Sequence, residues 1–335
     1  MKNRIWSLVI TAGLLVGMLT GCGSSAPKKV DKAADGGAKY HVVCTTYPQY
    51  DWVQNILGKQ TDKFEVTYLM NNGVDLHSYQ ASAEDMVKIG EADLFIYVGG
   101  ESDGWVADAL ENATNKNLIP VNMVDALGDS IKEEEVVEGM QAEDEEEEEA
   151  EGGEEEVEYD EHVWLSLRNA KKLVEVISEK LAQIDPQDAD AIKDRAKAYE
   201  QKLLNLDSEY EKAVKDAGHH TILFGDRFPF RYLADDYHLK YYAAFVGCSA
   251  ETEASFDTIT FLADKVDEEK LPVIYTIERS DQKIAKTIQK NTKDKNQKIL
   301  VLDSLQSVSK EDIQAGKTYL QTMEKNLSAV KEGLN

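Results

Sequence analysis

Two of the six histidines lie where a side chain could reach a ligand. His77 stands in the loop NNGVDLHSYQ, just before a segment that Ser82 and Asp85 can cap as a helix. His162 stands in YDEHVWL, where an acidic stretch turns into the next helical segment. Neutral imidazole is a common ligand for transition metals, but a loop histidine is as easily satisfied by a hydrogen bond to the backbone. Each histidine alone is therefore an ambiguous signal.

Carboxylates stand in comparable positions in the second half of the chain. Asp226, Glu278 and Asp303 each come at the end of a short apolar run that reads as a strand. Imidazole nitrogens from one half and carboxylate oxygens from the other would form a mixed site that suits Zn²⁺ or Mn²⁺. We expect structural roles for the other histidines, which lie at strand starts or near a helix end: His41, His219, His220 and His238.

The elements that would position these residues alternate between short apolar runs and amphipathic segments, the pattern of an α/β fold. We predict two α/β lobes, each with a four-stranded, mainly parallel sheet, joined by one long rigid helix. Sheets of this kind bind ligands beyond the carboxyl ends of their strands, so the two sheets would face a shared cleft. The predicted strands are 40–45, 64–70, 93–98, 117–121, 221–224, 239–246, 272–277 and 298–302. The predicted helices of the lobes are 48–58, 82–91, 103–113, 167–184, 228–237, 255–268, 281–291 and 310–331.

One helix is predicted to be much longer than the others. Asp185 would be its N-cap, Pro186 its first residue and Gly218 its terminator. Between these residues the apolar positions recur at alternating spacings of three and four, which predicts one continuous apolar stripe. At about 1.5 Å per residue the helix would be about 48 Å long, so we expect it to join the two lobes. An intermolecular coiled coil is the alternative use of such a stripe.

The charge of the chain is concentrated in one segment. Lys and Arg number 37 and Asp and Glu 63, so the net charge is -26, which disfavours binding to nucleic acid. Residues 133–161, which we call the acidic segment, hold 18 of these acids and no Lys or Arg. With few residues to bury, the segment is expected to be a disordered, solvated insertion. Two roles stay open for it: a weak collector of cations, or a solubilising insertion.

The amino terminus has the features of an export signal. A positively charged start precedes an apolar run at 5–19, which is shorter than the roughly 20 residues that span a bilayer as a helix. The run ends in LTGC, and small residues before a cysteine are typical of a bacterial lipoprotein; an uncleaved signal anchor is the alternative. We expect a lipoprotein signal peptide at 1–21, a lipid on Cys22 and a flexible tether at 22–39. The protein would then lie on the extracytoplasmic face of the bacterial cell membrane, held by its lipid anchor.

The chain is divided accordingly. We expect an N-terminal α/β lobe at 40–184, which carries the acidic segment, a linking helix at 185–218 and a C-terminal α/β lobe at 219–335. The protein is expected to be a monomer.

Several motifs resemble one known family. These are VVCTTYPQYDWVQNILG at 42–58, GVDLHSYQAS at 73–82, ADLFIYVGG at 92–100, DEHVWLS at 160–166 and VLDSL at 301–305. They are similar to the solute-binding lipoproteins of zinc and manganese ABC importers. The resemblance implies two lobes with the metal between them, zinc as the transported ion with manganese as the alternative, and an ABC transporter membrane permease as partner. It also implies that His77, His162 and Asp303 are metal ligands.

The chain departs from the family pattern at the third ligand. A His or Glu is expected five residues before Tyr232, but that position is Arg227, which cannot be a ligand. Asp226 would take the place if the loop shifts by one residue, and Glu278, Cys44 or a water are the other options. The second thiol of the folded part, Cys248, is expected, like Cys44, to be a buried and unreactive side chain. A position near the cleft is the alternative for both cysteines, because each follows the carboxyl end of a predicted strand.

Enzyme motifs are missing from the sequence. It has no HExxH, no GxSxG and no P-loop, so we expect a binding protein and no catalysis. A metallohydrolase with an open water position on the same ligands is one alternative. A receptor for an organic solute is another, and the presence or absence of stoichiometric metal in the purified protein distinguishes it from a metal receptor.

Overall fold

The structure is a computed structural model that describes residues 39–58, 60, 62–141, 158–249 and 253–335. The predicted signal peptide, the lipidation site Cys22 and all but the last residue of the tether lie outside the described residues. Within them, no helix is both long enough and apolar enough to cross a membrane.

The N-terminal lobe contains one parallel four-stranded sheet in the order β2-β1-β3-β4. Its strands consist largely of apolar side chains that the helices cover, as parallel strands require. The strands are β1 (Tyr40–Cys44), β2 (Phe64–Tyr68), β3 (Leu94–Tyr97) and β4 (Ile119–Asn122). The α-helices are α1 (Tyr47–Leu57), α2 (Ala83–Glu91), α3 (Val106–Glu111) and α4 (Met123–Leu127), and the short 3₁₀ turns are η2 (Leu76–Ser78), η3 (Glu101–Asp103), η4 (Gly128–Ser130) and η5 (Val163–Leu165).

The C-terminal lobe repeats this arrangement, with a parallel sheet in the order β6-β5-β7-β8. Its strands are β5 (Thr221–Phe228), β6 (Lys240–Val246), β7 (Val273–Ile277) and β8 (Lys298–Leu302). Its helices are α7 (Arg231–Asp236), α8 (Phe256–Glu269), α9 (Lys283–Asn291), α10 (Lys310–Gln314) and α11 (Tyr319–Gly333). The predicted fold class, two α/β lobes with four-stranded parallel sheets and a long helix, is confirmed.

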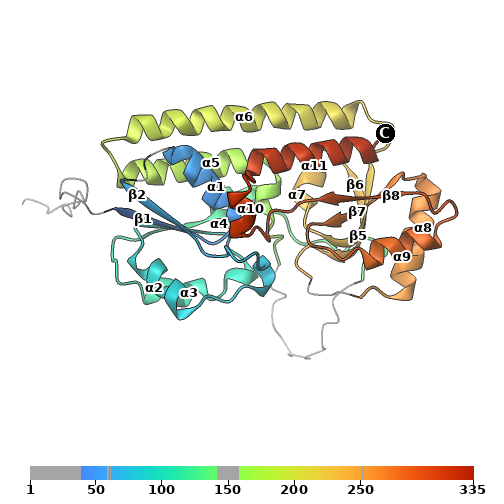
Figure 1. Cartoon of the computed structure of the whole chain (residues 1–335), viewed down its shortest axis with the longest axis horizontal. Helices are drawn as coiled ribbons and strands as arrows, with labels where there is room; N and C mark the ends of the chain where they lie inside the picture. The colour runs from blue at the N-terminus through green and yellow to red at the C-terminus, as the bar shows by residue number, and fades with distance from the viewer. Residues whose placement is uncertain (1–38, 59, 61, 142–157, 250–252) are drawn as a thin grey trace, which may run out of the picture.

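The long helix α6 (Ala189–Lys215) runs across both lobes on one side of the molecule (Figure 1). Helix α5 (Leu167–Ile184) packs between α6 and the first lobe, and α11 packs between α6 and the second. The predicted apolar stripe is buried in these contacts, from Ile192 to Ala213, so it is occupied within the chain. The side chains of Trp52 and Tyr319 meet edge to face, with ring centroids 5.3 Å apart, and belong to a core that extends through both lobes.

The start of α6 differs from the prediction. The helix begins at Ala189, with Asp188 at the N-cap position, and not at Pro186. Asp185 is instead the buried C-cap of α5, and its carboxylate accepts a hydrogen bond from Lys63 Nζ at 3.1 Å. The sequence could not tell which of two adjacent helices an Asp-Pro pair would end or begin.

Two other boundaries differ near functional positions. Strand β5 was predicted to end at residue 224, but it continues to Phe228 through an irregularity between Phe224 and Arg227. Asp226 and Arg227 therefore lie within a strand and not in a loop after it. The helix predicted at 310–331 is split into α10 and α11, because Gly316 has a φ of +89° and Thr318 caps a new helix by accepting from Gln321 N.

Candidate metal site

The two predicted histidines meet between the lobes. His77 lies in η2, whose N-cap Asp75 accepts a hydrogen bond from His77 N at 3.1 Å. His162 lies at the start of η5, and its backbone N donates to Asp160 Oδ1 at 2.8 Å. The Nε2 atoms of the two rings are 3.2 Å apart. Zn–N bonds of about 2.0–2.1 Å in a tetrahedron put two nitrogen ligands about 3.3 Å apart, so this spacing suits one shared ion.

The other nitrogen of each ring is held by the protein. His77 Nδ1 lies 2.9 Å from Ser102 Oγ, and His162 Nδ1 lies 3.0 Å from Asp160 Oδ1. Partners of this kind orient the ring of a metal-binding histidine and raise its basicity. With the Nδ1 atoms held in this way, the two Nε2 atoms lie next to each other.

Burial and neighbouring charges set different protonation states for the two rings. Burial, followed by the charge of His162, lowers the pKa of His77 to about 3, while Asp75 opposes the shift. Burial also acts against a charged His162, which is fully buried, but the charge and hydrogen bond of Asp160 outweigh it and raise the pKa of His162 above its usual value. Both ring nitrogens of His162 face oxygen atoms, Nδ1 facing Asp160 Oδ1 and Nε2 lying 2.9 Å from Gln306 Oε1.

A sulfur atom lies beside the histidine pair. One ligand atom from each of three residues, His77, His162 and Cys248, lies within 4.8 Å of the other two. Among the residues that the structure describes, this is the one group of three or more such side chains close enough to hold a metal ion. Cys248 follows β6 and is a free thiol. Burial raises the pKa of this thiol, and Asp160 and Glu134 add to the shift. The sequence favoured an unreactive buried thiol for Cys248, but the structure supports the alternative, a position near the cleft after the end of a strand.

The predicted oxygen ligands are not part of this group. Asp303 Oδ2 pairs with Lys317 Nζ at 2.5 Å, and its Oδ1 accepts from Leu305 N at 3.0 Å. Glu278 accepts from the backbone N and the Oγ of Ser304 at 2.7 and 2.8 Å. Both carboxylates are therefore engaged within the C-terminal lobe.

Asp226 and Cys44 are also apart from the histidine pair. Asp226 Oδ1 accepts from the neighbouring Arg227 N at 2.9 Å, while its Oδ2 is buried and has no hydrogen-bond partner. The residue borders a pocket between the lobes, which Asp75 and Glu278 also line. Cys44 is fully buried in β1 within the core, as predicted for a structural thiol.

Arg227, which stands at the third ligand position of the resembling family, links the lobes. Its Nη2 donates to Asp75 Oδ2 at 2.7 Å and its Nη1 donates to Ser249 O at 3.2 Å. The same Asp75 oxygen accepts from Gln306 Nε2 at 2.9 Å. Arg227 outweighs the effect of burial and holds the pKa of Asp75 below its usual value. Two donors from the second lobe thus hold the residue that caps the turn of His77.

A comparison with protein families matches most of the chain. Residues 42–333 match the family model described as zinc-uptake complex component A, periplasmic. The chain belongs to this family. The resemblance seen in the sequence motifs is thereby confirmed.

Relatives within the zinc-uptake family are similar over most of the chain. The zinc-binding lipoprotein AdcA of Streptococcus pneumoniae strain R6 is 33% identical over 301 residues, which cover 90% of this chain but 56% of AdcA. The chain thus spans little more than half the length of that relative. The high-affinity zinc uptake system protein ZnuA of Bacillus subtilis is 31% identical over 329 residues, 98% of each chain.

Solved structures share the fold. The Zn(II)-bound ZnuA-like domain of S. pneumoniae AdcA is 31% identical, with a TM-score of 0.68 over 89% of this chain and 99% of that domain. The metal-dependent lipoprotein YcdH of B. subtilis is 28% identical, with a TM-score of 0.70 over 88% of this chain and 99% of that one.

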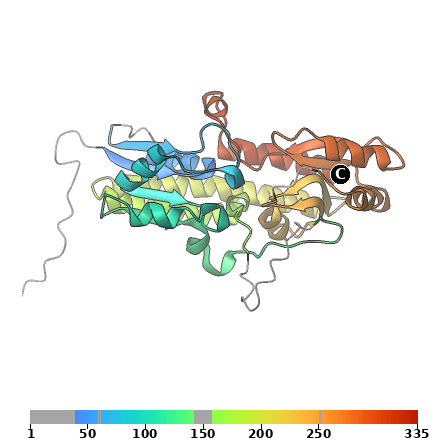
Figure 2. The ribbon, with the colours of Figure 1, turned by 90° about the horizontal axis from the view of Figure 1, so that it is seen from below.

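The first part of the acidic segment packs against the second lobe of this family member. Glu134 Oε1 accepts from Cys248 N at 3.1 Å, and Gln141 N donates to Ala244 O at 3.0 Å. Glu135 pairs with Arg231. Figure 2 shows the chain after α4 crossing from one lobe to the other. The expectation of a solvated insertion at 133–161 is therefore wrong for 133–141, and also for 158–161, where Asp160 and Glu161 are buried. Residues 142–157 lie outside the described part.

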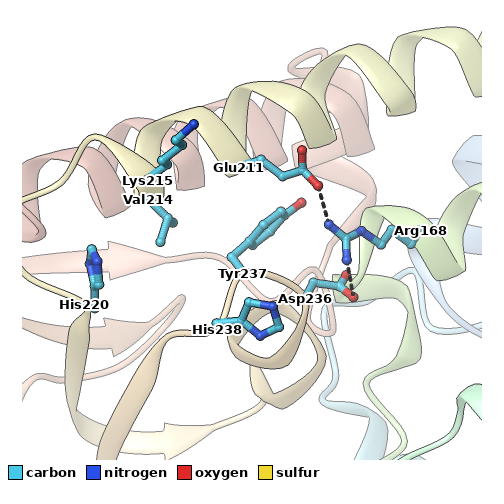
Figure 3. Close-up of a pocket in the computed structure, with 8 residues that line it drawn as sticks. All are labelled: Arg168, Glu211, Val214, Lys215, His220, Asp236, Tyr237 and His238. Carbon is cyan, nitrogen blue, oxygen red and sulfur yellow. Dashed lines mark hydrogen bonds and ion pairs between the residues drawn. The ribbon is translucent and has the colours of Figure 1, made fainter.

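A second pocket lies on the α6 side of the C-terminal lobe and contains two of the histidines set aside above, His220 and His238 (Figure 3). Arg168 in this pocket pairs with Glu211 at 2.7 Å and with Asp236 at 3.9 Å. Its charged groups thus join α5 to α6 and α7. His220 Nδ1 is bonded to the carbonyl of the preceding residue at 2.7 Å.

Proposed function

We propose that the chain is an extracytoplasmic receptor that binds one zinc ion between its lobes and delivers it to an ABC import permease. The observation that carries the proposal is the facing pair of Nε2 atoms, 3.2 Å apart, on His77 and His162. The relatives named as zinc-binding or zinc-uptake proteins support zinc as the ion. The role is that of a receptor and not of an enzyme.

Binding would exchange a proton for the metal. The Nε2 of His162 is bonded to Gln306 Oε1, so zinc must displace that proton and break that hydrogen bond. Ser102 and Asp160 keep their hold on the Nδ1 atoms, so the rings need no large reorientation. Asp303, carried over from the family motif, remains a proposed contributor only if it leaves Lys317, whereas Asp226 has a buried Oδ2 without a hydrogen-bond partner and remains a proposed contributor as it stands.

The decisive experiment is metal analysis of protein purified without chelator, followed by competition titrations. The wild-type protein is expected to hold about one zinc per chain. His77→Ala and His162→Ala should each lower zinc affinity by more than the roughly 10- to 100-fold that follows loss of a supporting group. His220→Ala, a histidine in the pocket of Figure 3, is the matched control and should bind zinc as the wild type does.

Because His162 is fully buried, folding of its variant must be checked by circular dichroism. His162→Gln, which keeps a polar side chain of similar size, serves as a second variant. Wild-type zinc affinity in folded His77 and His162 variants would refute the site.

We also propose that Cys22 carries a lipid that holds the receptor on the extracytoplasmic face of the cell membrane. The LTGC motif and the lipoprotein relatives support this anchor. One acyl chain gives only marginal binding, on the order of 10⁴ M⁻¹, so stable anchoring requires more than one chain. Cys22→Ala should move the protein from the membrane fraction to the soluble fraction. A variant that stays in the membrane fraction after signal removal would contradict the proposal.

A further inference from the structure

We propose that the thiolate of Cys248 is the third zinc ligand, with His77 and His162, and that it makes the site selective for zinc over manganese. The inference rests on the proposed function and names a ligand that the sequence motifs do not predict. It replaces the ligand that is lost where Arg227 stands.

The geometry requires only a small adjustment. The sulfur and the two imidazole nitrogens lie within 4.8 Å of one another, with the nitrogens at 3.2 Å. In a tetrahedral zinc site with Zn–S of about 2.3 Å and Zn–N of about 2.0 Å, the S···N separation is about 3.5 Å. A movement of about 1 Å in the loop that follows β6 would therefore complete the shell.

The backbone beside Cys248 is fitted to His162. A Cβ atom at Gly247 would lie 3.2 Å from both Nδ1 and Cε1 of His162 and 3.0 Å from Phe228 O. These distances are shorter than ordinary van der Waals contact, so a side chain at this position would push the loop or the ring away. Glycine thus lets the loop of Cys248 lie directly against a histidine of the metal pair.

Two groups from different elements hold the Cys248 loop. Glu134, from the packed start of the acidic segment, accepts a hydrogen bond from Cys248 N. Arg227 donates to the carbonyl of Ser249 with one nitrogen and to Asp75 with another. The residue at the former ligand position therefore connects the loop of the new ligand to the turn of His77.

The donor set decides the metal. Imidazole nitrogen and thiolate sulfur are both donors that zinc takes in proteins, and three such ligands leave a fourth position open, whereas manganese and calcium prefer oxygen donors. Metal binding would release the thiol proton to solvent as the Zn–S bond forms. No oxidant or reductant is needed.

The test uses the full chain carrying Cys22→Ala in every variant, so that Cys44 and Cys248 are the remaining cysteines. The protein loaded with Co²⁺ should show a thiolate-to-cobalt charge-transfer band in the near ultraviolet. Cys248→Ser should abolish the band and lower zinc affinity by about 100-fold or more, while Mn²⁺ affinity changes by less than about 10-fold. Cys44→Ala, which alters the buried thiol of β1, is the matched control and should keep the band.

A measurement on the protein with Cys248 intact guards against a variant that fails to fold. Zinc should slow the alkylation of Cys248 by iodoacetamide, as followed by peptide mass spectrometry. Absence of the cobalt band together with unprotected Cys248 would overturn the inference, even if His77→Ala and His162→Ala abolish zinc binding and the receptor function stands. Failure of the wild type to bind zinc would instead overturn the proposed function.

Discussion

The ion pair between Arg227 and Asp75 is expected to contribute measurably to both folding and zinc binding. The two side chains are 2.7 Å apart and only 16% and 20% exposed, so solvent and salt screen them weakly. A hydrogen bond between charged groups contributes about 1.5–3 kcal/mol net. We therefore expect Arg227→Gln to lower the free energy of unfolding by about 2–3 kcal/mol, since it also leaves the Asp75 carboxylate with a single donor from the second lobe.

A double-mutant cycle isolates the pair. Asp75→Asn keeps an acceptor for His77 N and so retains the N-cap of η2. Urea unfolding of the wild type, the two single variants and the double variant, all without metal, should give a coupling energy of about 2 kcal/mol between residues in contact. Lys298→Gln, which removes an exposed pair with Glu332, is the control and should cost less than about 1 kcal/mol.

The same pair should matter for zinc because Asp75 caps the turn that carries His77. Loss of a group that orients a ligand costs about 10- to 100-fold in metal affinity, and we expect that loss for Arg227→Gln in competition titrations. A coupling energy below about 0.5 kcal/mol together with unchanged zinc affinity would refute the view that Arg227 links the two lobes at the site.

Four further outcomes follow from the structure. Burial raises the pKa of Asp51 to about 6, so the folded state favours the protonated carboxyl group and the free energy of unfolding falls as pH rises through about 6. For a shift of about two units the loss is about 3 kcal/mol at neutral pH. Asp51→Asn should remove this loss when unfolding curves at pH 4 and pH 8 are compared, and an unchanged pH dependence would be evidence against the assignment. Gly247→Ala should weaken zinc binding in calorimetry, whereas Gly218→Ala, where a Cβ meets only an ordinary contact at 3.8 Å, should not. Deletion of 142–157 should leave tight zinc binding intact, while deletion of 134–158 should weaken it, because only the longer deletion removes Glu134 and Gln141; equal affinities would contradict this reasoning. Zinc at 100 times its dissociation constant should stabilise the folded protein by about 2.7 kcal/mol, and His162→Gln should lose this gain.

Local sequence patterns were enough to predict the fold and to single out His77 and His162, whose Nε2 atoms lie 3.2 Å apart; their role as metal ligands stays a prediction. Apolar runs of strand length, separated by amphipathic segments, define both sheets, and the stripe of α6 follows from its spacing. His77 and His162 could be predicted because each stands in a loop directly before a capped helix or turn. Their placement depends on local structure and on the rule that ligands gather at strand ends.

The orientation of the carboxylates expected as oxygen ligands could not be predicted from local patterns. Asp303 also follows a strand, but whether its carboxylate points to the cleft depends on Lys317, which lies 14 residues later and forms an ion pair with it. Nothing near Asp303 in the sequence shows this pairing. Cys248 could not be predicted as a ligand for a different reason, because a cysteine close to apolar residues is typical of a core. Its loop is held beside His162 by a hydrogen bond to Glu134 of the acidic segment, a contact that the sequence does not reveal.

The positive charge of Arg227, at the third ligand position, must be neutralised if a metal ion is to bind nearby. A guanidinium beside a divalent cation would repel it, and near the cleft that repulsion is poorly screened. In this structure Asp75 neutralises Arg227 and draws its nitrogens onto the turn of His77 and the loop of Cys248. An arginine here is therefore compatible with metal binding when an acid pairs with it, as Asp75 does, and the thiolate proposed for Cys248 would supply the missing ligand. Arg227, Asp75 and Cys248 thus depend on one another, and changing Arg227 to histidine alone would supply a nitrogen while releasing both supports of the present site.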